Sequence, residues 1–83
     1  MTSKVEYQGN LRTSAVHLQS NSNIITDAPI DNHGKGEAFS PTDLVATGLA
    51  CCLMTIMGIK AESMGIDLTG THATVKKHMS ASP

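Results

Sequence analysis

The feature that most constrains the fold is a long helical segment near the middle of the chain that is apolar on every face. Ser40 suits the N-cap, Pro41 suits the first helical position, and Asp43 completes an S-x-x-D capping pattern. With Gly65 as the C-terminal cap, these signals predict a helix over residues 41–64. Its apolar side chains cover all azimuths and do not form a stripe, so the helix is expected to be buried on all sides.

Short segments of alternating apolar and polar residues stand on both sides of this helix in the sequence. They predict antiparallel strands, three before the helix and one after it: residues 4–8, 11–19, 24–26 and 66–79. Gly9 and Asn10 suit the first hairpin turn because both tolerate a positive φ. Residues 27–39 are rich in turn formers and predict a loop, which is either a binding element or a solvated connector. The expected class is therefore α+β, with an antiparallel β-meander, a long buried central helix and a further β-strand.

The chain has 83 residues, which predicts a single small domain over residues 1–83. Three short strands cannot surround the helix, so a second subunit, or sequence missing from this chain, is expected to cover its other faces. The formal net charge is −1, from 6 basic and 7 acidic residues, and the only large aromatics are one Tyr and one Phe. Neither the charge nor the aromatic content indicates binding to nucleic acid or to an anionic membrane surface.

The apolar part of the helix is not typical of a membrane span. Between Leu44 and Ile59 it contains two threonines and two glycines, and a span needs about 20 predominantly apolar residues. We expect the helix to be buried in protein. The polar N-terminus lacks the apolar stretch of a signal peptide, and two adjacent cysteines do not form a disulfide framework. Both observations favour a cytoplasmic location.

Cys51 and Cys52 are the only cysteines, and both fall in the middle of the predicted helix. Adjacent helical residues point about 100° apart. The two thiols therefore face different neighbours, and a disulfide between them would need non-helical backbone. Gly48, one turn before Cys52, leaves open space beside that thiol. To react as a thiolate, a mid-helix thiol needs a nearby cation or hydrogen-bond donor, for which Arg12, Lys35 and His33 are candidates. The alternative is that both cysteines are small apolar core residues.

The four histidines and two cysteines do not have the spacing of metal ligands. On a continuous strand, His72 and His78 would lie about 20 Å apart, which is too far to share an ion. The sequence therefore predicts no metal site and no cofactor.

Four motifs, taken together, carry a family resemblance. They are Ser40-Pro41-Thr42-Asp43-Leu44 after a glycine-containing loop, Ala50-Cys51-Cys52 in a small-residue helix, Gly65-Ile66-Asp67-Leu68, and Lys76-Lys77-His78-Met79. In this combination the chain resembles the OsmC/Ohr family of osmotically inducible and organic hydroperoxide resistance proteins. The resemblance covers essentially the whole chain, but only the N-terminal portion of a family member.

The resemblance implies an OsmC-like fold completed by an intertwined homodimer, with long central helices between sheets formed by both subunits. It also implies that Cys52 is the reactive cysteine, because Cys52 has the family's spacing from Pro41. In such a mechanism the Cys52 thiolate attacks the peroxide O–O bond and becomes a sulfenic acid. A second cysteine then forms a disulfide with it, which an external dithiol reduces.

The chain departs from the family pattern in three places. Family peroxidases have a Glu directly after the proline, paired with an essential Arg, whereas this chain has Thr42 there and Asp43 one residue later. Arg12 is the only arginine and thus the candidate for the essential one. The family's second cysteine lies on a second helix, beyond residue 83. The candidate catalytic residues are therefore Cys52, Arg12 and Asp43.

Three functions are compatible with these residues. The first is a thiol-dependent peroxidase. The apolar residues around Cys52 favour an organic hydroperoxide over hydrogen peroxide as its substrate. The second, motivated by Thr42, is a non-catalytic family member that binds a small apolar ligand in the dimer-interface cleft. The third is a structural or interaction module in which Cys52 contributes only to stability.

Overall fold

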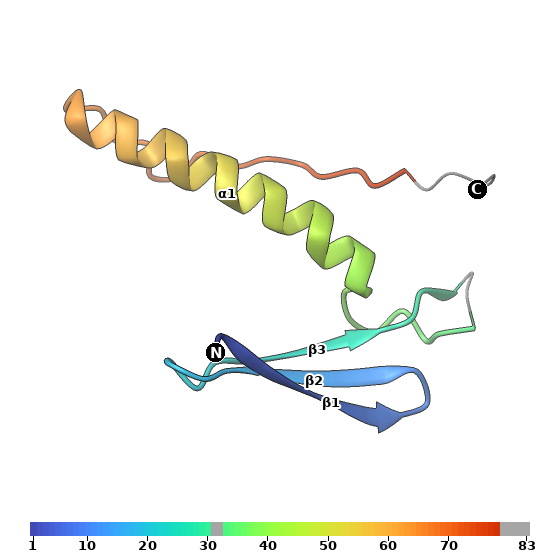
Figure 1. Ribbon diagram of the computed structural model, residues 1–83. Coiled ribbons are helices and arrows are strands. Elements are labelled where there is room, and N and C mark those ends of the chain that lie inside the picture. The colour runs from blue at the N-terminus through green and yellow to red at the C-terminus, as the bar shows by residue number, and fades with distance from the viewer. Residues whose placement is uncertain (31–32, 79–83) are drawn as a thin grey trace. The chain divides into compact units, whose positions relative to one another are not determined.

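The computed structural model describes residues 1–30 and 33–78, which form three strands and one helix (Figure 1). The element order, a three-stranded sheet followed by a helix, confirms the predicted α+β class. The chain divides into two compact units, Met1–Thr42 and Asp43–Pro83.

The first unit contains an antiparallel sheet with the order β1-β2-β3, which confirms the predicted meander. The strands are β1 (Ser3–Gly9), β2 (Arg12–His17) and β3 (Asn23–Asp27). The first turn falls at Asn10 and Leu11, one residue later than predicted, with φ values of 55° and 63°. Gly9 also has a positive φ, of 86°, but it pairs with Arg12 after a shift in register that follows Tyr7. A β-bulge of this kind accommodates one extra residue in β1, and the turn therefore begins one residue later.

The helix α1 (Pro41–Ser63) begins at the predicted residue and ends one residue before the predicted end. The Ile66 N–H donates to the Ala61 carbonyl oxygen at 2.8 Å, and the Gly65 N–H donates to the Glu62 carbonyl oxygen at 3.1 Å. These two bonds, with Gly65 at a φ of 70°, form a Schellman motif. The predicted role of Gly65 as the C-terminal cap is confirmed.

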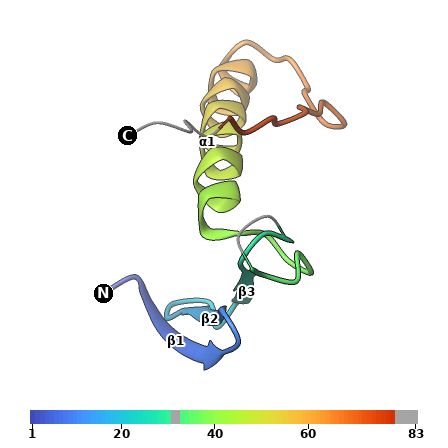
Figure 2. The same ribbon diagram turned by 90° about the vertical axis from the view of Figure 1, so that its right-hand side faces the viewer.

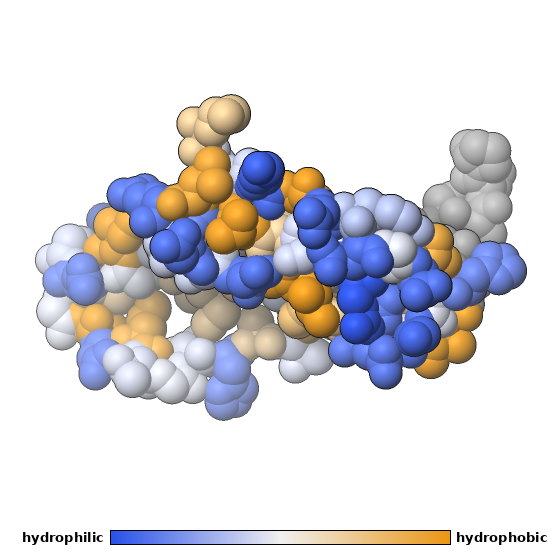
Figure 3. Space-filling model, turned by 90° about the horizontal axis from the view of Figure 1, so that it is seen from below, coloured by the Kyte–Doolittle hydropathy of each residue, from blue (hydrophilic) through white to orange (hydrophobic). Residues whose placement is uncertain are grey.

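The expectation of a buried central helix is not met within this chain. Ala61 is the buried residue of α1. Six of the large apolar side chains of the helix are exposed: Val45, Leu49, Leu53, Ile56, Met57 and Ile59. Figure 3 shows one face of the molecule, on which orange apolar side chains lie among blue polar ones. The helix is hydrophobic all round, and the segment that follows it covers too little of that surface. By length and composition alone α1 could cross a membrane, a test that the core helix of a soluble protein also passes.

After α1 the chain runs back toward the start of the helix (Figures 1 and 2). The Lys77 Nζ lies 2.8 Å from the Asp43 Oδ1, which ties this segment to the first helical turn. The predicted strand over residues 66–79 is wrong between residues 66 and 78, where no strand is assigned. A strand needs a neighbouring backbone to pair with, and the described sheet contains only β1, β2 and β3. Met79 lies outside the described residues.

Candidate functional site

Both thiols lie in the middle of α1, and both are exposed rather than packed in a core. The Thr55 Oγ1 donates to the Cys51 carbonyl oxygen at 2.8 Å, one turn along the helix. Gly48, one turn before Cys52, has open space where a Cβ would stand. The surface beside Cys52 is therefore open to a small molecule within the described chain.

Asp43 and Cys52 share α1 but do not meet on it. Nine residues of helix separate them by about 14 Å along the axis. The Asp43 carboxylate instead pairs with Lys77 at 2.8 Å, in the turn where the helix dipole favours negative charge. The ion pair between Asp43 and Lys77 therefore stabilises the start of α1.

Arg12 is the first residue of β2 and belongs to the first unit. Its Nη2 donates to the Glu37 Oε1 at 2.9 Å and to the Asp27 Oδ2 at 3.2 Å. The Glu37 backbone N–H also donates to the Asp27 Oδ2, at 3.1 Å. One guanidinium and two carboxylates thus form a connected group, which we call the Arg12 cluster.

The charges in the Arg12 cluster stabilise one another. The pKa of Asp27 is lowered, first by the hydrogen bond from the Glu37 backbone N–H and then by the bond from Arg12, against the opposing effect of burial. The pKa of Arg12 is raised by its hydrogen bonds to Asp27 and Glu37. Asp27 is therefore ionised at neutral pH although its side chain is only 1% exposed.

Asp27 and Glu37 are functional candidates that the sequence analysis missed. The sequence pattern predicts Asp27 as the first residue of a loop, but it is the last residue of β3 and stands opposite Arg12 in the antiparallel register. Opposite charges at paired positions of neighbouring strands attract. Extending the third strand by one residue would have revealed this pair, whereas Glu37 comes from a loop and has no such signal.

The loop after β3 is anchored to the sheet at its base. The Asp27 N–H donates to the Phe39 carbonyl oxygen at 3.0 Å, and the Ala28 N–H donates to the Leu11 carbonyl oxygen at 3.2 Å. A Cβ at Gly34 would stand 1.7 Å from the Ala28 carbonyl oxygen, so this position requires glycine. The anchored loop holds Glu37 beside Arg12.

A small pocket of about 120 Å³ adjoins the Arg12 cluster. It is lined by the first hairpin turn and by charged side chains: Gln8, Gly9, Asn10, Arg12, Asp27 and Lys35. The Asp27 Oδ1 is buried and has no hydrogen-bond partner among the described residues. The pocket therefore contains donors from Arg12 and Lys35 beside a carboxylate that can accept another bond.

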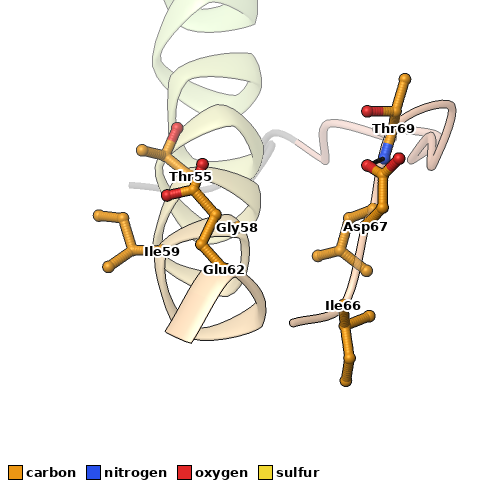
Figure 4. Close-up of a pocket in the computed structure, with 8 residues that line it drawn as sticks. Thr55, Gly58, Ile59, Glu62, Ile66, Asp67 and Thr69 are labelled. Atoms are coloured by element: carbon orange, nitrogen blue, oxygen red, sulfur yellow. Dashed lines mark hydrogen bonds between the residues drawn. The ribbon is translucent and has the colours of Figure 1, made fainter. Parts of the chain in front are cut away.

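A larger open pocket of about 370 Å³ lies in the second unit, near the end of α1 (Figure 4). Thr55, Gly58, Ile59 and Glu62 line it from the helix, and Ile66 to Thr69 line it from the following segment. The pKa of Asp67 is lowered by hydrogen bonds from the Thr69 side chain and backbone. This pocket contains neither cysteine, so it is not a candidate for thiol chemistry.

Within the part of the chain that the structure describes, no group of three or more His, Cys, Asp or Glu side chains could hold a metal ion. The chemistry-bearing groups are thus the helix thiols in the second unit and the Arg12 cluster in the first.

A family model described as OsmC-like protein matches residues 34–83. A crystal structure from Psychrobacter arcticus 273-4, proposed to be an osmotic stress induced and detoxification response protein, is similar over 100% of this chain. The two share 70% sequence identity with a TM-score of 0.96, and the chain spans 61% of the length of that solved chain. None of the curated proteins compared with the chain matches it.

Proposed function

This chain belongs to the OsmC-like protein family, and we propose that it is a thiol-dependent redox protein that reduces organic hydroperoxides through Cys52. The observation that carries the proposal is the position of Cys52 eleven residues after Pro41, the spacing of the reactive cysteine in the family, on the helix α1, where its thiol is exposed within a single chain. A thiol that is to attack a peroxide must be reachable, and a thiol sealed in a core is inert. The detoxification role proposed for the similar Psychrobacter protein agrees with this chemistry.

The first step is attack of the Cys52 thiolate on one oxygen of the hydroperoxide. The O–O bond breaks, Cys52 becomes a sulfenic acid, and the leaving alkoxide takes a proton to form the alcohol. A thiol of an external dithiol then condenses with the sulfenic acid and releases water. Its second thiol attacks the mixed disulfide and returns Cys52 to the reduced state.

The surroundings of Cys52 favour an apolar hydroperoxide. Leu49, Leu53 and Ile56 are exposed on the same helix and within one turn of it. Exposed apolar side chains next to a reactive group are suited to an alkyl or aryl substituent. In this proposal Arg12 keeps its role as the candidate essential arginine, and Asp43 maintains the start of α1 through its pair with Lys77.

We also propose that the protein acts in the cytoplasm as a homodimer. A reducing compartment supplies the external dithiol that the second half of the cycle consumes. A second copy would cover the apolar surface of α1, which this chain leaves exposed. Neither nucleic acid nor a membrane has a role in this proposal.

The proposal is tested by treating the reduced protein with one equivalent of cumene hydroperoxide in the presence of a sulfenic-acid trap. Mass spectrometry should find the adduct on Cys52, formed faster than with hydrogen peroxide. Cys51→Ser is the matched control and should keep the adduct, whereas Cys52→Ser should lose it. Equal, slow labelling of both cysteines would contradict the proposal.

A second candidate function is binding of a small apolar ligand without catalysis. It is favoured by Thr42, which offers no carboxylate after the helix proline, and by the exposed apolar side chains of α1. Saturable binding of a fluorescent fatty-acid probe that survives Cys52→Ser, in a protein that forms no sulfenic acid, would favour this candidate.

A further inference from the structure

We propose that the open pocket near the C-terminal end of α1 binds a small organic cation, in which an ammonium group is attached to an apolar body. The pocket has a volume of about 370 Å³, which lies within the range of small-molecule sites. All eight residues that line it belong to the second unit, and neither cysteine is among them. The inference is therefore independent of the proposed function.

Backbone hydrogen bonds hold the two walls of the pocket in place. Four residues at the spacing of one helical face form the first wall: Thr55, Gly58, Ile59 and Glu62. Residues 66–69 form the opposite wall (Figure 4). The Schellman bond from the Ile66 N–H to the Ala61 carbonyl oxygen begins this second wall, and a bond of 2.9 Å from the Thr71 N–H to the Leu68 carbonyl oxygen closes a turn at its end. The pocket is thus formed by structure that needs no ligand.

Each wall carries one carboxylate, Glu62 on the helix and Asp67 on the segment after it (Figure 4). The Asp67 Oδ1 accepts from the Thr69 backbone N–H at 2.9 Å. Hydrogen bonds from Thr69 lower the pKa of Asp67, so this carboxylate is ionised at neutral pH. No hydrogen bond or ion pair joins the Glu62 carboxylate to another residue in the part of the chain that the structure describes. Both groups can therefore accept from a cation that enters the pocket.

The charge of the lining has one sign. None of the eight described residues that line the pocket is Lys, Arg or His. Glu62 lies in the last turn of α1, where the helix dipole disfavours a negative charge. Lys60 lies in the same turn but does not line the pocket. A cation in the pocket would offset the unfavourable placement of Glu62, whereas an anion would be repelled.

The rest of the lining favours an organic cation over a metal ion. Ile59 and Ile66 are 65% and 49% exposed, so an apolar body bound against them would remove apolar surface from water. Two carboxylates are too few for a divalent cation such as Ca²⁺, which takes about six to eight oxygen ligands. The ligand class that matches both the charge and the apolar walls is an alkyl or aryl ammonium compound.

Gly58 leaves room for this ligand. It borders the pocket from the interior of α1, and the space where its Cβ would stand is open. A glycine inside a helix lowers stability relative to alanine, because its backbone loses more freedom on folding. The cost is explained if the missing side chain keeps the pocket open. A large side chain at this position should then compete with the ligand.

The test titrates the 83-residue chain with 2-phenylethylammonium and follows the backbone amide signals by NMR. Saturable shifts are expected at the residues that line the pocket. Two matched probes have a similar body but a different charge: 2-phenylethanol is neutral and 3-phenylpropionate is negative. Both should bind about tenfold more weakly or not at all, since each loses two partly exposed charge contacts of about threefold each.

Three variants test the residues that carry the inference. Glu62→Gln and Asp67→Asn should each raise the Kd for 2-phenylethylammonium about threefold, and Asn at position 67 can still accept from the Thr69 N–H. Gly58→Leu should weaken binding more than either of them, because it fills part of the pocket. Glu6→Gln, which changes a carboxylate on β1, is the control and should leave the Kd unchanged.

Four outcomes would overturn the inference. The first is the absence of saturable shifts in the wild-type protein, and the second is equal affinity for the three probes, which would indicate an apolar surface without charge preference. The third is an unchanged Kd in both carboxylate variants. The fourth is a set of equal shifts produced by ammonium chloride at the same concentration, which would show that the pocket attracts charge alone and does not recognise the organic body.

Discussion

At the scale of single residues, the Asp27 carboxylate joins β2, β3 and the following loop of the first unit. The group is buried, and it holds Arg12 from β2 and the Glu37 backbone from the loop. Hydrogen bonds from these donors lower its pKa below the ordinary value of 3.8. The ionised form is therefore favoured by folding, and its contribution to stability depends on pH.

The first prediction is that Asp27→Asn lowers the free energy of unfolding at pH 7. Because the folded-state pKa is depressed, the stabilisation is fully present well above pH 3.8 and is lost as the pH falls through the folded-state pKa. The difference between wild type and variant should thus shrink in acid. Urea denaturation at pH 7 and pH 3 measures it, with the exposed Glu6→Gln as the control, expected within about 0.5 kcal/mol of wild type. A difference that stayed constant with pH would exclude this source of stability.

At the scale of elements, sequence reasoning worked best where the determinants are local. Both ends of α1 were predicted to within one residue, because Pro41 and Gly65 act through their own backbone conformations. The predicted strand is absent over residues 66–78, because a strand also needs a neighbouring backbone to pair with. For the same reason the Arg12–Asp27 pair was missed, since it depends on the register between β2 and β3.

The second prediction compares two glycines of the helical region. Gly65→Ala should destabilise the protein by about 1 kcal/mol, because Gly65 has a φ of 70° in the Schellman motif. Gly58→Ala is the matched control. It lies inside α1, with open space where the Cβ would stand, and should stabilise the helix by about 0.5–1 kcal/mol. Thermal unfolding of both variants checks the opposite signs, and destabilisation by Gly58→Ala would indicate that another chain packs closely at that position.

At the scale of the whole molecule, the apolar surface of α1 has no cover within the described residues of the chain. Six large apolar side chains of the helix are exposed: Val45, Leu49, Leu53, Ile56, Met57 and Ile59. A continuous apolar surface of this kind is typical of an interface. Sequence reasoning predicted that something must cover the helix, because this follows from its composition, but a single chain cannot specify the geometry of a partner.

The third prediction is therefore that the protein associates through α1. Light scattering behind size exclusion should give twice the mass of one chain. Leu49→Asp, which places a charge at a 70% exposed apolar position of the helix, should shift the protein toward the monomer. Burial of an unpaired carboxylate in an apolar interface is costly, so the shift should appear across a concentration series.

Ile30→Asp is the control for that experiment, because Ile30 is an apolar residue with 77% exposure that lies outside α1. The same chemical change there should leave the mass at twice that of one chain. Equal loss of the dimer in both variants would indicate a general effect of added charge. A wild-type protein that remains monomeric at all concentrations would contradict the homodimer, because the apolar side chains of α1 would then remain exposed to water without a partner.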